Sequence, residues 1–362
     1  MCPTQRQTPE RPKSCRTPCC KRGLRVSKSL LAVWVCAGLC SCRLLLNSLL
    51  TIYCTTGKSA YPEAQFFLAE CFGNGSLGLP VDHDKAFSLY HQASKQSHPS
   101  ATYRTAVCYE VGAGTKRDAT RAVQYFRKSA GLGDTAAMYK LGMILLNGLL
   151  SAPKNAREGI SWLKRAAQQA SEDCPHALHE LGLLYEGRTE GTGNIIPDAA
   201  YAYDLFLKAS QFGYAPSQYK LGLSYEYGLL NLPVDPRRSI AWYTRAAEQG
   251  DSEAELALSG WYLTGAEGVL KQSDTEAYLW SRKAADKGLA KAEYAVGYYS
   301  EHGVGVKIDV EESRRWYLRA ASQGNKRALQ RLKELKAYAA ASRGNARRDF
   351  RKEKDSADCV IM

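Results

Sequence analysis

One stretch of this chain is repeated seven times, and the repetition constrains the fold more than any other feature. The clearest copy runs from Ala215 to Gly250 and contains two apolar segments joined by a short loop. Gly228 follows the first segment, where the end of a helix favours a residue that tolerates positive φ. Asp235 and Pro236 then supply an N-cap and a proline for the start of a second helix. Each copy therefore predicts a helix–turn–helix unit.

Two positions recur in every copy. The first, which we call the small slot, lies in the first helix and holds Ala69, Ala106, Gly142, Gly182, Gly222, Ser259 and Gly297, at spacings of 36 to 40 residues. The second, the bulky slot, lies in the second helix and holds Leu89, Tyr125, Trp162, Leu205, Trp242, Trp280 and Trp316. Small residues in one helix and large ones in the next suit stacked helical hairpins. The period predicts an all-α solenoid.

The pattern AxYxLGxxYxxG…VxxDxxKAxxWYxKAAxxG resembles the Sel-like repeat, a relative of the tetratricopeptide repeat. The resemblance extends from about Pro62 to Gly324. Within it, AFSLYHQASKQSHPSATYRTAVCYEVGAGTKRD and AVQYFRKSAGLGDTAAMYKLGMILLNGLL resemble the fungal chitin synthase regulatory factors. Members of that family can end in a prenylation box, and this sequence ends in Cys359-Val-Ile-Met362.

The resemblance implies a non-catalytic adaptor without cofactors. Its partners would be the catalytic subunit of a chitin synthase and the scaffold proteins that localise it, for chitin synthesis at the septum and cell wall. It would lie at the cytoplasmic face of the plasma membrane, at a septum or growth site. A second Sel-like adaptor role, in membrane-protein degradation at the endoplasmic reticulum or as another signalling scaffold, stays open. Glycosylation at Asn74 would favour that role, and farnesylation at Cys359 would exclude it.

The net charge of +13 alone would suggest a nucleic-acid partner. The charge is confined to the tails, however, because residues 1–60 carry +9 and residues 325–362 carry +6, which leaves −2 for residues 61–324. Basic tails of this kind favour anionic membrane or acidic partners. No nucleic-acid-binding module is recognisable, so we expect no nucleic-acid partner.

The C-terminal part divides into two segments. Residues 325–341 predict a charged helix that caps the open end of the solenoid, as terminal repeats must. Residues 342–362 form a basic linker that ends in the prenylation box, with Cys359 as the modified thiol and a terminal Met that favours farnesyl. One lipid gives only marginal membrane binding, so the basic residues at 347–354 are the expected second signal.

The N-terminal part has no counterpart in the repeats. Residues 1–28 are basic and predict a disordered segment. Residues 29–60 begin with the apolar stretch 29–54, which allows three interpretations: a membrane helix, a signal sequence, or a segment that is not native protein. A span would place the solenoid and Cys359 on the far side of the membrane, in conflict with cytosolic prenylation. Arg43 would also be costly in mid-bilayer.

Repeat four carries an insertion, Gly187–Pro197, in its loop. Insertions of this kind lie on one face of a solenoid, often the binding face, although a surface loop also tolerates them. Three other short motifs do not match the functional sites that they resemble. Thr56–Ser59 lacks the leading glycine of a phosphate loop, and Gly112–Gly114 follows a helix rather than a strand. His176 and His179 favour a helix-face pair over a metal site. We therefore expect no catalytic residue, no cofactor and no metal.

Overall fold

The computed structural model describes residues 61–187 and 196–337. The basic segment 1–28, the hydrophobic segment 29–60, most of the insertion and the linker with Cys359 lie outside the described residues. The elements are α3 (Pro62–Asn74), η2 (Ser76–Gly78), α4 (His83–Lys95), α5 (Pro99–Val111), α6 (Ala119–Gly131), α7 (Thr135–Asn147), α8 (Ala156–Gln168), α9 (His176–Tyr185), α10 (Ala199–Gln211), α11 (Ala215–Tyr227), α12 (Pro236–Glu248), α13 (Ser252–Thr264), α14 (Asp274–Asp286), α15 (Ala290–His302) and α16 (Val310–Ser322).

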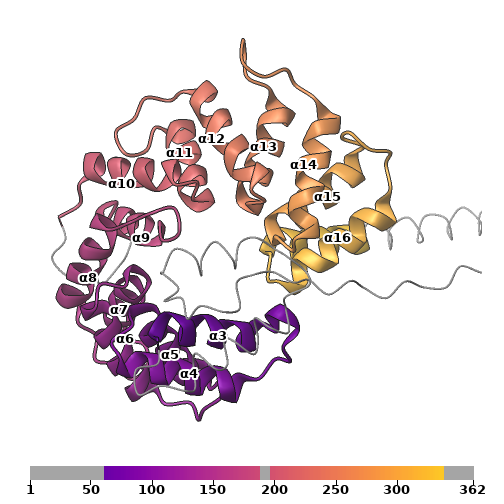
Figure 1. The fold of residues 1–362 in the computed structure, drawn as a ribbon. Helices are drawn as coiled ribbons and strands as arrows, with labels where there is room; N and C mark the ends of the chain where they lie inside the picture. Colours follow the sequence, from indigo (N-terminus) through magenta and orange to yellow (C-terminus); the bar gives the residue numbers. More distant parts are fainter. Residues whose placement is uncertain (1–60, 188–195, 338–362) are drawn as a thin grey trace, which may run out of the picture.

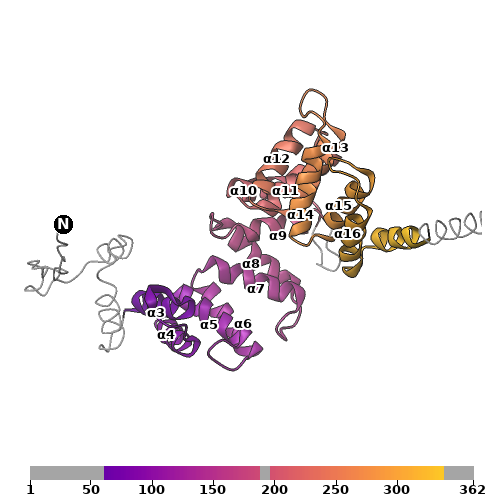
Figure 2. The same ribbon diagram turned by 90° about the vertical axis from the view of Figure 1, so that its right-hand side faces the viewer.

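The described residues contain helices and no strand, with one isolated antiparallel bridge between Ala266 and Leu270. Odd-numbered helices are the first helices of the seven repeats, and even-numbered helices are the second ones. They follow one another around a curved solenoid (Figure 1), which also rises out of the plane of that view (Figure 2). The prediction of an all-α solenoid is confirmed.

The helices begin and end where local sequence chemistry places them. The side chain of Asp235 accepts a hydrogen bond from the backbone N–H of Arg238 at 3.1 Å, which caps α12. Gly228 ends α11 in the left-handed conformation, at φ 66°. The N-cap residue of every second helix also donates its backbone N–H to a carbonyl near the end of the first helix, at 2.8–3.0 Å; the residues are Asp82, Asp118, Asn155, Asp198, Asp235, Ser273 and Asp309. These bonds close each helical hairpin.

The first helices lie toward the inside of the curve and the second helices lie outside it. The arrangement is plainest for α3 against α4, for α9 against α8 and α10, and for α11 against α12 (Figure 1). The first helices therefore provide the inner surface of the solenoid.

In the four repeats whose small slot is a glycine, a large side chain from the second helix of the same repeat fills the slot. A Cβ added at Gly222 would lie 2.6 Å from Cδ1 of Tyr243, and one at Gly297 would lie 2.8 Å from Cδ1 of Tyr317. Each filling residue stands one position after the bulky slot. We call this the plug position; it holds Tyr90, Phe126, Leu163, Phe206, Tyr243, Ser281 and Tyr317. The tertiary contact is therefore one residue beyond the bulky slot.

The bulky slot has a different task, which is to join neighbouring repeats. Trp242 packs against Ala202 and Phe206 of the preceding second helix, and Trp316 packs against Ala284 and Ala285. Leu89, Leu205 and Trp316 are buried, whereas the other bulky-slot residues are half-buried: Tyr125, Trp162, Trp242 and Trp280. Consecutive residues on the second helix thus make contacts within a repeat and between repeats.

The last described segment, residues 326–337, is helical and continues the stack. Its side chains Ala328 and Leu332 pack with Tyr317 and Ala320 of α16. In the register of the repeats this segment is a first helix, and Lys333 occupies its small slot. The described part of the stack therefore closes with half a repeat.

Candidate functional site

The first helices, which line the inside of the curve, carry a recurring row of side chains. This inner row stands one residue after each small slot and consists of Glu70, Val107, Met143, Leu183, Leu223, Gly260 and Tyr298. Its central members are apolar and half-buried. Further exposed hydrophobic side chains lie one turn along, at Val111 and Tyr227, which are 70% and 64% exposed. A partially exposed apolar track of this kind marks an interaction surface.

Ion pairs join successive repeats beside the inner row. Lys140 lies 3.1 Å from Glu110, Lys220 lies 2.8 Å from Glu186, and Arg331 pairs with Glu301. The cation stands two residues before the small slot in each case. Lys220 and Glu186 are both nearly enclosed, so removal of either partner would leave a buried charge, at a cost of about 3–5 kcal/mol. The others are more exposed and contribute less.

Repeat four lacks the cation that the neighbouring repeats place two residues before the small slot. Glu180 occupies the position that Lys140 and Lys220 hold in the neighbouring repeats. Among the described residues no ion pair or hydrogen bond is made by its half-buried carboxylate, and burial raises its pKa. The inner surface therefore carries one poorly compensated acidic group midway along the solenoid, beside the apolar row.

His176 and His179 form part of an aromatic cluster rather than a metal site. The rings of both histidines lie about 5 Å from the ring of Tyr214, at 4.9 and 5.3 Å. Nδ1 of His179 lies 2.8 Å from Oγ of Ser217. Burial, aided by the charge of Lys220, lowers the pKa of His179 to about 4. His179 is therefore a neutral imidazole that packs between repeats four and five and stabilises their contact.

The insertion in repeat four leaves the hairpin closed. Asp198 donates its backbone N–H to the carbonyl of Tyr185 at 3.0 Å, the same bond that closes the other hairpins. The described ends of the insertion therefore meet, and the extra residues lie between them. Gly187 and Pro197 are in contact at this point, since a Cβ on Gly187 would lie 3.0 Å from the proline ring.

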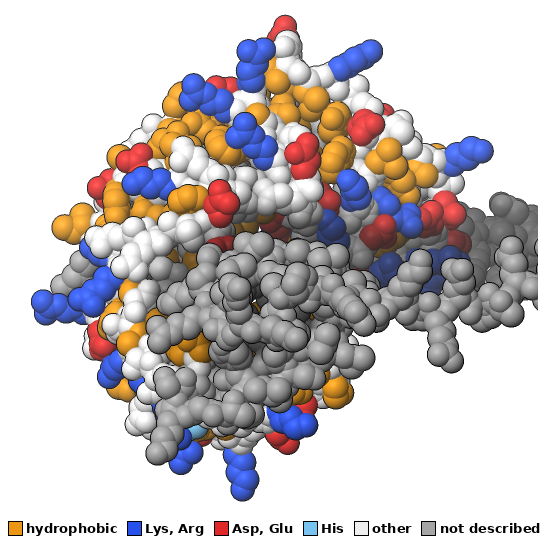
Figure 3. Space-filling model, viewed as in Figure 1, with side chains coloured by type: hydrophobic (Ala, Val, Ile, Leu, Met, Phe, Trp, Pro, Cys, Tyr) orange, Lys and Arg blue, Asp and Glu red, His pale blue; other side chains and the backbone are white. Residues whose placement is uncertain are grey.

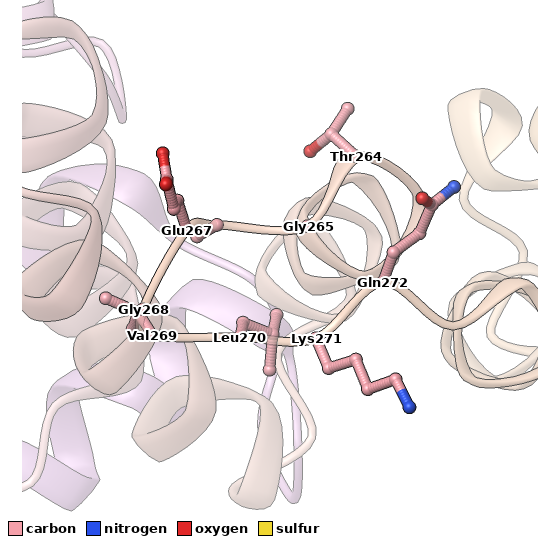
Figure 4. Close-up of a pocket in the computed structure, with 9 residues that line it drawn as sticks. Thr264, Gly265, Glu267, Gly268, Val269, Leu270, Lys271 and Gln272 are labelled. Atoms are coloured by element: carbon pink, nitrogen blue, oxygen red, sulfur yellow. The ribbon is translucent and has the colours of Figure 1, made fainter.

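A hollow in the loop between α13 and α14 is lined by Thr264–Gln272. The loop is closed by the bridge between Ala266 and Leu270 and protrudes from the solenoid (Figure 1). In Figure 4 the side chains of Glu267 and Lys271 point in opposite directions. The lining comes from one loop, and its charged groups do not converge, so it lacks the arrangement of an active site.

The second helices carry a different set of groups. Cationic side chains lie over four of the tryptophans, with Arg245 4.8 Å from the ring of Trp242 and Lys283 4.3 Å from that of Trp280. Figure 3 shows charged side chains of both signs distributed among hydrophobic ones over the visible surface. The cations lie over the faces of these rings and help to solubilise this surface.

The described residues contain no group of three metal-ligating side chains. Within the same ranges, no helix has the length and hydrophobicity to cross a membrane. The Gly112–Gly114 loop packs closely on the preceding repeat, because a Cβ on Gly114 would collide with the carbonyl oxygen of His83. Asn74 ends α3 and is exposed.

The predicted site residues thus divide into two groups. The small and bulky slots belong to the core and hold the repeats together. The inner row and Glu180 were not identified from the sequence, because no local signal separates these apolar residues from core residues or this acid from other surface acids. Cys359 lies outside the described residues, and its modification stays a prediction.

Comparison with known families places the repeats. The Sel1 repeat model matches residues 62–98, 99–134, 135–171, 175–213, 215–251, 252–289 and 290–325. Among solved structures, a Sel1 repeat protein from Oxalobacter formigenes is 26% identical with a TM-score of 0.62, over 81% of each chain. A protective antigen of uropathogenic Escherichia coli, with an SLR fold, is 23% identical with a TM-score of 0.63, over 86% of this chain and 67% of the antigen.

Several relatives carry descriptive names. Chitin synthase regulatory factor 3 of Schizosaccharomyces pombe is 42% identical over 310 residues, which are 86% of this chain and 33% of the relative. The chitin synthase regulators SKT5 of Malassezia restricta and Saccharomyces cerevisiae are 45% and 37% identical, over 78% and 75% of this chain. The chain matches only 20% and 39% of those two proteins. The chain belongs to the Sel1 repeat family and is homologous to the fungal chitin synthase regulatory factors.

Proposed function

We propose that this chain is a non-catalytic adaptor that binds, activates and localises a chitin synthase for septum and cell-wall synthesis. The names of its relatives support a regulatory role. The observation that supports the proposal is the inner row, whose central members are half-buried apolar side chains, together with the carboxylate of Glu180, which has no ion-pair partner among the described residues. Partners of α-solenoids bind along such extended concave surfaces.

The chemistry of the inner surface defines the segment that it binds. Val107, Met143, Leu183 and Leu223 follow one another in repeats two to five and suit apolar side chains of an extended or helical segment. Glu180 adds a requirement for a cationic side chain at the middle of that segment. A lysine or arginine there would satisfy a carboxylate that burial otherwise disfavours. The bound segment of the synthase or its scaffold is therefore apolar with a central basic residue.

The first test places a charge in the inner row, at a half-buried side chain that borders the core, and compares it with the same charge on an exposed surface. Leu183→Asp places a charge in the inner row, and Leu318→Asp places the same charge on α16, where the leucine is 50% exposed. Co-purification of chitin synthase with the tagged full-length protein should fall at least about tenfold for Leu183→Asp, equivalent to 1.4 kcal/mol. Leu318→Asp should retain it, with equal helical circular dichroism in both variants. Equal loss in the two variants would place the binding surface elsewhere.

We propose further that a farnesyl group on Cys359 anchors the chain to the cytoplasmic face of the plasma membrane. The lipid contributes up to about 0.8 kcal/mol for each buried methylene group. The basic residues at 347–354 add at most about 1 kcal/mol each near anionic lipid, less what the nearby acids cancel. The two signals together make the binding stable, whereas either one alone is marginal.

Cys359→Ser therefore should move the protein from the membrane fraction to the cytosol, and leave a weak, salt-sensitive remnant. Chitin synthase activity in the same cells should fall partly, because the solenoid still reaches its partner from solution. Glycosylation of Asn74, seen as a mobility shift after endoglycosidase treatment, would contradict this topology and support the role at the endoplasmic reticulum. Unchanged synthase activity after deletion of the gene would refute the regulatory role.

A further inference from the structure

The C-terminal end of the described solenoid carries a charge opposite to that of the rest. Residues 313–337 contain eight Lys or Arg and one Glu, a net charge of +7, whereas residues 61–312 carry −5. This end consists of most of α16 and the segment 326–337, which is the last described helix of the stack (Figure 2). A terminal repeat needs a polar outer face, but side chains of either charge would meet that need. The single sign therefore requires a separate explanation.

Most of these cations are exposed and make no ion pair with another described residue. Arg331 pairs with Glu301 and Glu334, and the guanidinium of Arg319 lies over the ring of Trp316 at 4.7 Å. The other six are exposed and form no ion pair within the described ranges; they are Arg314, Arg315, Lys326, Arg327, Lys333 and Lys336. Cations gathered in this way attract an anionic partner.

Two exposed leucines lie among these cations. Leu329 is 44% exposed and stands four residues before its small slot, at a position that is 5% exposed or less in every repeat. Its counterparts are Gln65, Thr102, Met138, Leu178, Gln218, Glu255 and Glu293. Leu318 is 50% exposed and stands two residues after the bulky slot, where Arg127 and Arg282 form ion pairs with the second helix of the next repeat. Both leucines therefore face the end of the stack.

Two of the cations occupy positions where other repeats place aromatic rings in contact. Phe87, two residues before its bulky slot, packs against Tyr109 of the next first helix, with ring centroids 5.3 Å apart. The hydroxyl of Tyr203 likewise lies 3.0 Å from that of Tyr225. The equivalent residues at the end of the stack are Arg314 and Lys336. Two like charges thus start from adjacent positions on packed helices, and an anion between them would stabilise both.

We propose that these six cations, together with Leu318 and Leu329, form a surface that binds an anionic phospholipid membrane. We call this surface the terminal patch. Cations interspersed with exposed aliphatic side chains suit the membrane interface, where the cations contact lipid phosphates and the aliphatic groups enter the acyl boundary. The core of a protein interface is depleted of charge, and two leucines surrounded by six cations do not provide such a core. The membrane therefore fits the terminal patch better than an acidic protein does.

The terminal patch complements the proposed lipid anchor without depending on it. The described chain leaves the patch at Ala337, and Cys359 follows 22 residues later. A membrane-bound lipid on Cys359 would hold the patch near the same bilayer and raise its effective concentration there. The inner row of repeats two to five lies away from this end, so it would stay accessible to the chitin synthase.

The test uses the purified full-length Cys359→Ser protein, so that no prenyl group contributes. Binding to phosphatidylcholine vesicles with about 30% phosphatidylserine is measured by co-sedimentation. Arg314→Glu combined with Lys336→Glu should weaken binding at least about tenfold, because two attractive charges become repulsive. The matched control is Lys154→Glu combined with Arg157→Glu, which makes the same change in net charge at two exposed cations of repeat three. It should alter binding by no more than about twofold.

Leu329→Ser tests the apolar part of the terminal patch separately. It should weaken vesicle binding by about threefold or more at both low and high salt, since burial of an aliphatic group is not screened by ions. The loss caused by the double charge reversal should instead shrink as salt is added. Equal helical circular dichroism in all variants checks that they are folded.

Three results would overturn the proposal. Equal weakening by the double reversal and by its control would show that overall charge, rather than the terminal patch, attracts the vesicles. Failure of the parent protein to bind the vesicles at about 0.1 M salt would show that the patch has no affinity for anionic lipid. Retention on immobilised polyglutamate, abolished by the double reversal and without vesicle binding, would identify an acidic protein as the partner. Chitin synthase is absent from these measurements, so their failure would leave the proposed function to its own test.

Discussion

Repeats five and six fill the same slot in two different ways. In repeat five, Gly222 leaves room for Tyr243 of its own second helix, and the hydroxyl of Tyr243 donates to Glu226 at 2.6 Å. In repeat six the small slot holds Ser259, and the plug position holds another small residue, Ser281. The slot is completed by Tyr299 of the next repeat, whose hydroxyl lies 3.1 Å from Oγ of Ser259.

The difference shows that the same repeat motif can be stabilised by a contact within one hairpin or by a contact between two repeats. The contact between Gly222 and Tyr243 stabilises a single hairpin. The contact between Ser259 and Tyr299 joins α13 to α15, so the stability of repeat six depends on its neighbour. In a solenoid, where stability is approximately the sum of repeat and interface contributions, these two arrangements respond differently to substitution.

The largest expected effect is at the contact between repeats. Tyr299→Ala should reduce the free energy of unfolding by about 3–5 kcal/mol, since it removes a buried aromatic ring and leaves a cavity. Hydrogen exchange should accelerate in both α13 and α15. Tyr298→Ala is the matched control, because that neighbouring ring is 42% exposed and its loss should cost about 0.5 kcal/mol or less. Faster exchange in α15 alone would argue against coupling through this residue.

A smaller loss is expected within repeat five. Gly222→Leu forces a side chain against the ring of Tyr243, and overpacking of this kind costs about 1–3 kcal/mol. The control is Gly260→Leu on α13, where an added Cβ meets no atom within 4 Å. Denaturant titration should show a loss for the first variant and none for the second. An unchanged denaturation midpoint for Gly222→Leu would mean that α11 and α12 can accommodate the larger side chain without loss of stability.

The smallest effect tests the polar contact in repeat six. The hydroxyl of Ser259 donates to the carbonyl of Ala277 at 2.7 Å, so Ser259→Ala should cost about 1 kcal/mol through the lost hydrogen bonds. Ser259→Gly should cost more, because it also introduces a flexible residue into α13. Thermal unfolding of the two variants measures which of them loses more stability. A larger loss of stability for Ser259→Ala than for Ser259→Gly would show that helix propensity does not decide the difference at this slot.

The inner surface was less predictable than the core. Leu183 and Leu223 look like ordinary apolar residues of an amphipathic helix, and the sequence pattern does not distinguish them from Leu181 and Leu221, which are fully buried. Glu180 looks like one more surface acid. Its significance depends on Lys140 and Lys220, whose pairing with Glu110 and Glu186 becomes visible only when neighbouring repeats are stacked.

Local chemistry in the sequence determined the repeats of this protein, their helix caps and their small slots, because glycine, aspartate and the 3.6-residue period act within a few residues of each other. Tertiary structure alone decided which large residue fills each slot. Trp242 and Tyr243 are both large and adjacent, and about 100° of helical rotation directs one to the neighbouring repeat and the other to Gly222. The same applies to Ser259, whose partner Tyr299 lies in the next repeat and is brought to it by the stacking of the helices.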